Sequence, residues 1–459
     1  MMFSSPITDI LCALGWRVIA QSTPHIWTAM RVELNTPGIY HSQFNLAHTF
    51  LKNSRTLPLR IFILRGNGRD PHNQGVDSRY FEDIIQLLNA HSGRWRHLDV
   101  QLPHALVSQL TDASSDSYSQ LEALKISGYV SYANGDGMRP TAPGTLWKMK
   151  SSRPSPRRVD ITGFRLRRVK INWNNTTEVT FRSLYANECL ELFRQASRVV
   201  ACTIINVTIG HDEDSPEPTC LVPTLLSLKT LKISFSSRIS ESLVMDRICA
   251  PVLTHLSVNG SGPHDYIERL IDRSTCQLLS LEIGDEGYEI VGRLDISSIA
   301  RKTPRLKSLW LNNLSFNDFK VVFELLAQTS EPLGDVESDL APGCFSQLST
   351  FGCTSSYSLP WSKIPNFFPR RDAGADAVHR PFRVLDINVT IGHDETSNFI
   401  DPETVHQLLG LVKRGGIWLR IFNRAMEKDL IEASCEYHGI AIPEGVNLIH
   451  GGMVMPVVD

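Results

Sequence analysis

The residues with the strongest chemical character occur twice in the sequence. Ile205–Glu213 and Ile387–Glu395 both read INVTIGHDE, nine identical residues at an offset of 387 − 205 = 182 positions. Each copy ends in adjacent His, Asp and Glu, side chains that could bind a metal ion or act as general acid and base. Alternate residues of an extended chain share a face, so His211 and Glu213 could share a ligand and Asp212 could not. Because two ligands are too few for a zinc site, we interpret both corners as solvated loops.

The strand that leads into each corner must position these side chains. Ile205, Val207 and Ile209 alternate with polar residues, which predicts a β-strand with the three apolar side chains on one face. Gly210 and Gly392 then allow the chain to turn into a loop. The duplication predicts that the two copies are equivalent units of one repeating array, with both corners at the same edge of a sheet.

No established catalytic or ligand-binding motif occurs elsewhere in the sequence. There is no G-x-S-x-G, Walker, H-E-x-x-H or EF-hand pattern. The nine cysteines are scattered without any C-x-x-C pair, which predicts free thiols in a reducing compartment. We therefore expect no catalytic, metal-binding or cofactor-binding residues, no cofactor, and a protein that is not an enzyme. An enzyme with a convergent site is the third hypothesis for the function.

The composition is that of a globular protein without a strong electrostatic bias. Of the 459 residues, 42% are hydrophobic and 20% are charged, and the net charge is −2. This balance provides no general attraction to nucleic acid or to anionic lipid, so neither is expected as a partner. The sequence has no signal-peptide pattern and no long uncharged apolar segment, which predicts a cytoplasmic and/or nuclear location without a membrane span.

The elements that carry these side chains follow a repeating pattern. Short apolar segments of the form L-x-x-L-x-I alternate with segments of helical period, at intervals of about 25 to 35 residues in much of the chain. Three of the strand segments are LRRVKI at 166–171, LKTLKI at 228–233 and LKSLWL at 306–311. The alternation predicts an α/β leucine-rich-repeat-like solenoid with a curved parallel sheet. A doubly wound α/β sheet is the alternative, although no Gly-rich phosphate loop follows any strand segment.

The N-terminal stretch GWRVIAQSTPHIWTAM, residues 15–30, carries a resemblance to a known family. Its pattern W-R-x-I-A-x-S-T-P-x-x-W resembles the last two helices of the F-box in a large group of fungal F-box-like proteins. Ser22 or Thr23 is expected to cap the second of these helices, and Pro24 to occupy its first turn. Trp27 is expected to supply bulk to a small helical core.

The resemblance implies a domain organisation and a function. The Leu-Pro pair and the helix with which an F-box opens have only Pro6 and Ile7 near their place, so residues 1–35 are expected to form a partial F-box-like helical segment. Residues 36–459 are expected to form a divergent leucine-rich-repeat-like solenoid. Similarity to the family implies a non-enzymatic protein-interaction module, the substrate-recognition subunit of a Skp1-cullin-F-box ubiquitin ligase. The alternative is a free-standing repeat scaffold protein that does not bind the ligase.

Two sets of site residues follow from this interpretation. The resemblance implies that a Skp1-type adaptor would bind the F-box-like remnant at Leu11, Leu14, Trp16, Arg17, Ile19, Pro24 and Trp27. An unknown protein substrate would contact strand positions that alternate with the apolar core positions, and the candidates for this surface are Lys232, His255, Glu282 and Trp310.

Overall fold

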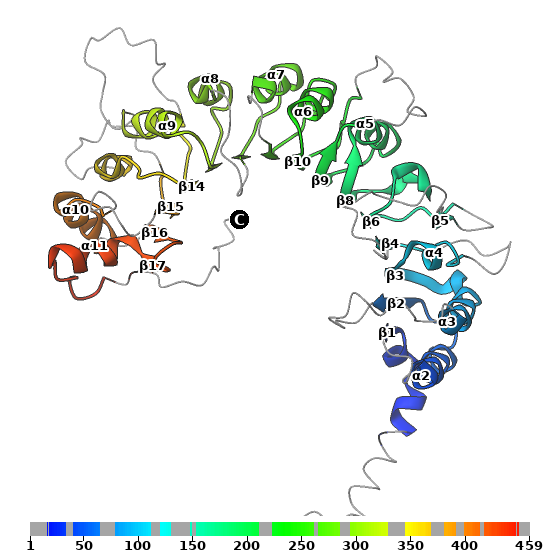
Figure 1. The fold of residues 1–459 in the computed structure, drawn as a ribbon. Helices are drawn as coiled ribbons and strands as arrows, with labels where there is room; N and C mark the ends of the chain where they lie inside the picture. Colours follow the sequence, from blue (N-terminus) through cyan, green and yellow to red (C-terminus); the bar gives the residue numbers. More distant parts are fainter. Residues whose placement is uncertain are drawn as a thin grey trace, which may run out of the picture. The chain divides into compact units, whose positions relative to one another are not determined.

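The computed structural model describes the strands, helices and turns of most of the chain (Figure 1). The described residues are 16, 18–33, 40–64, 79–111, 120–129, 147–148, 153–210, 223–260, 265–284, 294–328, 345–368, 381–391, 399–413, 417–446 and 448. No helix among these residues has the length and the apolar character needed to cross a membrane.

The first of two compact units, Met1–Asn206, is an α/β unit whose strands pair in the order in which they occur in the chain. Its parallel sheet contains β1 (Ala29–Glu33), β2 (Leu59–Leu64), β3 (Trp95–Pro103), β4 (Ala123–Tyr129), β6 (Arg158–Thr162), β8 (Glu178–Tyr185) and β9 (Ala201–Thr208), the last of which continues past Asn206. The helices are α2 (Tyr40–Asn53), α3 (Arg79–Asn89), α4 (His104–Val107) and α5 (Ala186–Gln195). Short 3-10 turns are η1 (Pro24–Trp27), η3 (Ser92–Arg94), η4 (Leu166–Arg168) and η5 (Trp173–Asn175).

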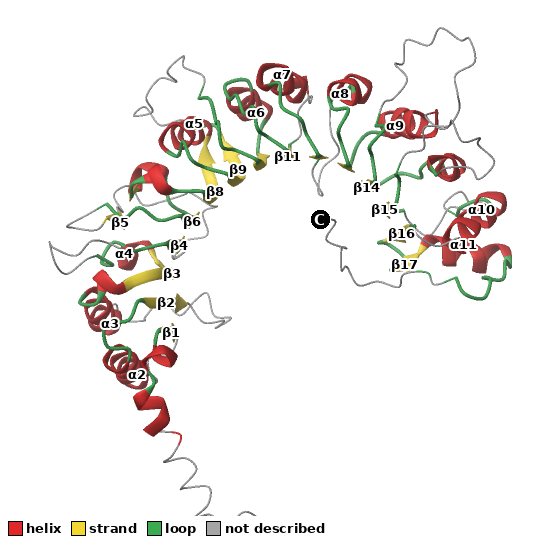
Figure 2. Ribbon diagram, turned by 180° about the vertical axis from the view of Figure 1, so that it is seen from behind, coloured by secondary structure: helices red, strands yellow, loops and turns green. Residues whose placement is uncertain are grey.

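The second unit, Val207–Asp459, repeats this arrangement. Its parallel strands are β10 (Thr230–Phe235), β11 (His255–Asn259), β12 (Ser280–Ile283), β13 (Ser308–Asn312), β14 (Thr350–Ser355), β15 (Val384–Val389) and β16 (Trp418–Asn423). A short antiparallel strand, β17 (Lys428–Asp429), pairs with β16. The helices are α6 (Arg238–Met245), α7 (Asp265–Ser274), α8 (Ile296–Lys302), α9 (Phe316–Gln328), α10 (Pro402–Lys413) and α11 (Leu430–His438), with the 3-10 helix η6 (Trp361–Phe367). Within each unit the helices lie on one face of the sheet (Figures 1 and 2).

The core lies between the sheet and this helical layer. The central leucines of the repeated pattern are at most 2% exposed in the second unit, at Leu231, Leu256, Leu281 and Leu309. Burying each of these side chains stabilises the fold by about 1.5–3 kcal/mol relative to leaving it in water. The side chains that alternate with them point to the other side of the sheet, which we call the open face. The sequence-based assignment of core positions is thus confirmed for these strands.

One predicted strand segment does not join the main sheet. Residues 166–168 form η4, and the two residues that follow, β7 (Val169–Lys170), pair only with β5 (Trp147–Lys148) in a separate small sheet. The places beside β4 and β8 are taken by β6, which pairs with both. Because β6 and β8 are hydrogen bonded to each other, no position in the sheet is left for the chain that connects them.

The INV residues of both copies lie in strands, as predicted, but the two copies are not equivalent. Ile387 in β15 is fully buried, whereas the matching Ile205 in β9 is only half-buried and its neighbour Ile204 takes the core position. Asn206 has a left-handed backbone with φ of 63°, which adds a residue to the strand as in a β-bulge and returns Val207 to the core. The prediction that Ile205 and Val207 share one face is therefore wrong. The His-Asp-Glu corners of both copies lie outside the described residues.

Candidate protein-interaction surfaces

The predicted adaptor-binding segment exposes apolar side chains. Residues 18–22 are helical, and the exposed fraction is 70% for Trp16, 66% for Val18 and 54% for Ile19. Isolated apolar side chains on a surface are common, but Trp16 and Ile19 are three residues apart in a helical segment and share one side, so they form a local apolar patch. Of the other predicted residues, Leu11, Leu14 and Arg17 lie outside the described part of the chain.

Trp27 and Pro24 position this segment. The Trp27 indole Nε1 donates a hydrogen bond to the Ala20 carbonyl at 2.6 Å, and its ring meets the Phe50 ring of α2 edge-on at 5.0 Å between centroids. Pro24 occupies the first turn of η1, as predicted, since a missing N–H costs nothing there. Trp27 is half-buried and joins the segment to α2.

The predicted capping by Ser22 or Thr23 is wrong. Thr23 is the N-cap residue of η1, but its side chain makes no hydrogen bond to that turn. The hydroxyls of Ser22 and Thr23 instead donate to the Ile19 carbonyl, at 2.9 and 2.8 Å. They satisfy a backbone acceptor at the end of the preceding helical residues, because hydroxyls can bond to carbonyls three or four residues earlier.

The four predicted partner-contacting residues share the open face of the second unit. The strand register aligns Lys232 with Ser257, Ser257 with Glu282, and Glu282 with Trp310, so these positions form one row across β10 to β13. His255 lies in the adjacent row, aligned with Thr230 and Ser280. Lys232 and His255 are exposed, whereas Glu282 and Trp310 are half-buried.

Beyond Trp310 the row continues through Gly352 on β14. The Trp310 indole lies over this glycine so closely that a Cβ atom there would be 2.2 Å from the indole Cε3 and Cζ3 atoms. The indole Nε1 donates to Ser308 Oγ at 3.1 Å, which fixes the other end of the ring. Gly352 thus acts as the platform that sets the orientation of the only large aromatic side chain among the four candidates.

We expect Gly352→Ala to displace the Trp310 indole and to lower the free energy of unfolding by about 1–3 kcal/mol, the usual cost of overpacking. Urea denaturation and tryptophan emission of the folded protein would measure the two effects. Gly410→Ala is the matched control, because nothing lies within 4 Å of a Cβ at that position in α10. The control should gain about 0.5–1 kcal/mol from helix propensity. Equal effects of the two substitutions would contradict the platform role.

The same row ends in a buried ion pair that the sequence-based search missed. Asp386 on β15 and Arg420 on β16 are 1% and 5% exposed. Arg420 Nε donates to Asp386 Oδ1 at 2.8 Å, and one terminal nitrogen donates to Asp386 Oδ2 at 3.3 Å and to Asn388 Oδ1 at 3.0 Å. The rings of Trp418 and Phe422 flank the guanidinium at 5.9 and 5.8 Å from their centroids.

Burial and charge act in opposite directions on this pair. Burial raises the pKa of the Asp386 carboxyl above its ordinary value, and the hydrogen bonds and charge of Arg420 lower it in part. A signal for the pair was present in the sequence. Both residues directly follow the central leucine of their strand segment, Leu385 and Leu419, as Lys232, Glu282 and Trp310 do in theirs. Opposite charges at the same place in neighbouring copies indicate contact across two strands.

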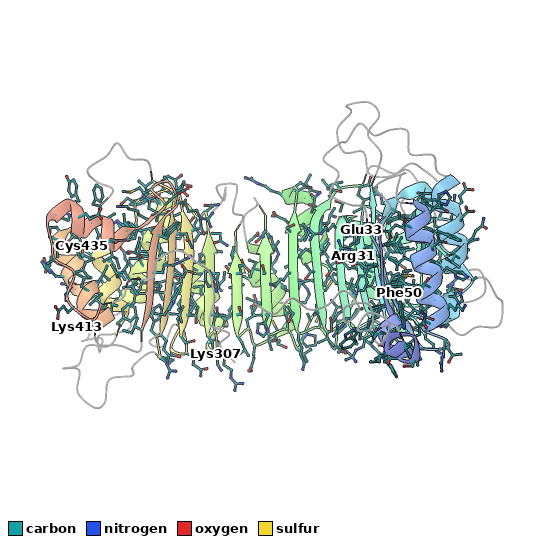
Figure 3. All side chains as sticks on the ribbon, turned by 90° about the horizontal axis from the view of Figure 1, so that it is seen from below. Arg31, Glu33, Phe50, Lys307, Lys413 and Cys435 are labelled. Carbon is teal, nitrogen blue, oxygen red and sulfur yellow. The ribbon has the colours of Figure 1, made fainter. Side chains whose placement is uncertain are left out.

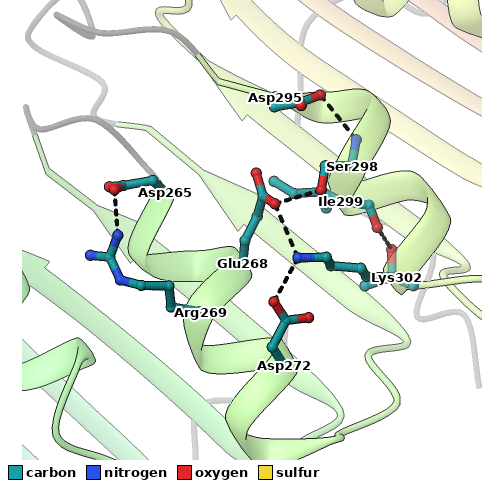
Figure 4. Close-up of polar contacts among 9 residues, drawn as sticks. Asp265, Glu268, Arg269, Asp272, Asp295, Ser298, Ile299 and Lys302 are labelled. Carbon is teal, nitrogen blue, oxygen red and sulfur yellow. Dashed lines mark hydrogen bonds and ion pairs between the residues drawn. The ribbon is translucent and has the colours of Figure 1, made fainter.

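The helical side of the second unit carries ion pairs that join neighbouring helices (Figure 4). Lys302 of α8 contacts Asp272 at 2.7 Å and Glu268 at 3.2 Å, both on α7. Arg269 of α7 contacts Asp246 at the C-cap of α6 at 2.8 Å, as well as Asp265 within its own helix. These groups are partly exposed, so each pair contributes little to stability. Within the described residues, no group of three or more His, Cys, Asp or Glu side chains could hold a metal ion. The six described cysteines are free thiols.

The sequence was also compared with known proteins. No protein-family model matches it. A search of curated proteins found no match either. The functional assignment therefore depends on the arrangement of the strands, the open face and the N-terminal apolar segment described above.

Proposed function

We propose that the chain is a protein-interaction module in which a partial F-box-like segment precedes a divergent leucine-rich-repeat-like solenoid, and that the open face binds a partner protein. The observation that carries this proposal is the row of aligned side chains across β10 to β13, on the face without helices, where Lys232 is exposed and Glu282 and Trp310 are half-buried. The continuation of the row at Asp386 and Arg420 is buried and is not part of the proposed binding surface. Within the second unit, each strand from β11 to β16 pairs with the one before it in the chain.

Two features favour a solenoid over a doubly wound sheet. A doubly wound sheet carries helices on both faces and reverses its strand order at a switch point. Here the strand order follows the chain order within each unit, and the helices cover one face. In a solenoid each unit buries its apolar face against its neighbours, which leaves the strand side free as a binding surface.

The chemistry of the open face suits protein recognition. Trp310 is half-buried on its glycine platform, and Lys232, His255 and Glu282 lie around it. Tryptophan is enriched among residues that dominate binding energy, and mixed charges set specificity. The exposed Trp16 and Ile19 are suited to bind a Skp1-type adaptor, so the proposed role is substrate recognition for a cullin-based ubiquitin ligase.

The ligase role is tested by co-purification with a Skp1-type adaptor. We expect the intact chain to bind the adaptor and the Trp16→Ala/Ile19→Ala variant not to bind it, because the substitutions remove the exposed apolar patch. Leu226→Ala/Ile239→Ala is the matched control, since these side chains are 68% and 61% exposed elsewhere in the chain. If the intact chain does not bind the adaptor, the free-standing scaffold replaces the ligase subunit as the proposal.

The open face is tested separately by affinity purification of partners from the native cell. Trp310→Ala is expected to lose at least one specific partner, and Val321→Ala, which truncates a 40% exposed side chain on α9, is expected to retain it. Quantitative mass spectrometry of the two purifications measures the difference. A partner set that is unchanged by Trp310→Ala would overturn the assignment of the open face.

A further inference from the structure

Three cations lie in a row just before the strands of the second unit begin. They are separate from the candidate residues of the open face. The backbone N–H groups of Thr254 and His255 both donate to the Lys229 carbonyl at 2.9 Å. In the same way, Thr350 N–H donates to the Lys307 carbonyl at 3.0 Å, and Trp418 N–H donates to the Arg383 carbonyl at 2.7 Å. Lys229, Lys307 and Arg383 therefore occupy the same position before their strands, and we call these three residues the basic rim.

The basic rim is exposed and forms no ion pair with any described acidic residue. All three side chains are exposed, and Figure 3 shows Lys307 at the edge of the sheet from which the strands start. Within the described part of the second unit, no carboxylate forms an ion pair with any of them. The positions between them in this row are neutral, at Thr254, Leu279 and Ser349. The rim is thus a strip of uncompensated positive charge.

In the first unit, two cations at the starts of strands form ion pairs with carboxylates. Arg96 forms an ion pair with Glu122 at 2.8 Å, and Glu122 N–H donates to the Arg96 carbonyl, so these two residues hold the rim position of neighbouring strands. One residue further along, Arg158 of β6 pairs with Glu178 of β8 at 3.0 Å. A carboxylate at the start of the next strand can therefore neutralise a cation at this position. No described carboxylate does so for Lys229, Lys307 or Arg383. Like charges that do not pair contribute nothing favourable to folding, so their presence needs another reason.

We propose that the basic rim is a docking surface for an acidic segment of a partner protein. Adjacent strands are about 4.8 Å apart, which places Lys229 and Lys307 about 14 Å apart and Lys307 and Arg383 about 10 Å apart. Cations separated by neutral side chains match a peptide in which Asp or Glu alternates with neutral residues. Nucleic acid, with a phosphate at every step, would require a denser row of cations.

A cavity beside the rim offers a place for one acidic side chain. The cavity, of about 330 Å³, lies between the loops that lead into β12 and β13, and its lining includes Thr275, Lys302, Thr303 and Arg305. Lys302 is already paired with Asp272, which also lines the cavity, and the Thr275 and Thr303 hydroxyls donate to the Ser274 and Ile299 carbonyls. Arg305 is the lining cation for which no ion pair is seen among the described residues, so it is the donor for an incoming carboxylate. This inference rests on the proposed interaction role, but it concerns a surface other than the open face.

The test measures binding of a fluorescein-labelled peptide of twelve residues that alternates Glu with Ser, by fluorescence anisotropy at low and physiological salt. We expect the dissociation constant to rise roughly tenfold or more in Lys229→Gln/Lys307→Gln/Arg383→Gln, and its salt dependence to weaken. The control, Arg301→Gln/Lys320→Gln/Lys413→Gln, removes three exposed cations from helices of the same unit and should change binding less than twofold.

Several results would overturn the inference. These are an equal loss in the control variant, unchanged binding in the rim variant, equal binding of a peptide with Gln in place of Glu, or tighter binding of a twelve-nucleotide oligo-dT. Urea denaturation should give the rim variant the same stability as the intact protein, so loss of folding cannot mimic loss of binding. If the rim variant binds the peptide unchanged but Trp310→Ala still loses its partner, the inference about the rim is wrong and the proposed function stands. If the rim variant loses the peptide but Trp310→Ala keeps its partners, the rim stands and the assignment of the open face is wrong.

Discussion

Arg420→Met should lower the free energy of unfolding of the second unit by about 3–5 kcal/mol, because it leaves the Asp386 carboxylate buried without its cation. Methionine keeps most of the volume between Trp418 and Phe422, so the loss reflects charge rather than a cavity. The removed hydrogen bonds are those from Arg420 to both Asp386 oxygens and to Asn388. Urea denaturation followed by circular dichroism measures the change.

Two further variants separate the charge effect from other causes. Asp386→Asn/Arg420→Met removes both charges and should recover most of the stability, since no unpaired ion remains. Lys428→Met breaks an exposed pair with Glu436, whose side chains are 49% and 60% exposed, and should cost less than about 1 kcal/mol. Equal losses in Arg420→Met and Lys428→Met would contradict the claim that burial makes the Asp386 pair important.

The Arg420→Met variant should also depend strongly on pH. Burial already raises the pKa of Asp386 above its unfolded value, and removal of the cation raises it further. A carboxyl whose pKa is raised in the folded state binds its proton more tightly in the folded than in the unfolded protein. The free energy of unfolding of the variant should therefore increase as the pH falls from neutral towards 4. The same unfolding experiment in a pH series tests this direction, and a loss of stability on acidification would contradict it.

Asp429→Asn is expected to remove a large part of the pH dependence of the C-terminal region. Asp429 caps α11, and its Oδ1 accepts from the Ile431 and Glu432 N–H groups at 2.9 and 3.2 Å. Its Oδ2 is buried and has no hydrogen-bond partner within the described chain. Burial therefore raises the pKa of Asp429 from 3.8 to about 6, which corresponds to about 3 kcal/mol.

The sign of this effect follows from proton binding. Because the folded-state pKa of about 6 lies above the unfolded value of 3.8, stability from this group is highest below pH 4 and falls as the pH rises towards 6. Asparagine does not titrate and is also a good N-cap residue, so Asp429→Asn should flatten the profile and be more stable than the intact protein at pH 7. Asp295→Asn, at the exposed N-cap of α8, is the matched control for the same substitution at a cap outside the core. A profile that Asp429→Asn does not alter would contradict the role of the buried carboxyl.

Much of the strand pattern could be predicted from local sequence. The central leucines at Leu231, Leu256 and Leu309 are buried as predicted. Apolar residues at alternate positions of a short strand share one face, and burying that face removes all of them from water. The alternation within a strand also placed Lys232 and Trp310 on the face opposite those leucines. The same spacing failed for LRRVKI at 166–171, where neighbouring strands with better alternation occupy the sheet.

The candidate sites were only partly predictable. Trp310 was identified as a binding residue, but its dependence on Gly352 comes from a strand that lies 42 residues further along the chain, at 352 − 310 = 42. The basic rim was not predicted, although Lys229, Lys307 and Arg383 each follow the first apolar residue of their strand segment. Only the backbone pairing of the strands places these positions in one exposed row.

The amino-acid sequence by itself determined most strand segments of the second unit, which of their leucines enter the core, and that INV is a strand in both copies. The tertiary structure alone decided the environment of those copies. Asn388 is 7% exposed beside Asp386 and Arg420, whereas the identical Asn206 is exposed in a left-handed bulge. The physical reason is register: a shift of one residue exchanges the two faces of a strand, and pairing with neighbouring strands sets which face each side chain takes.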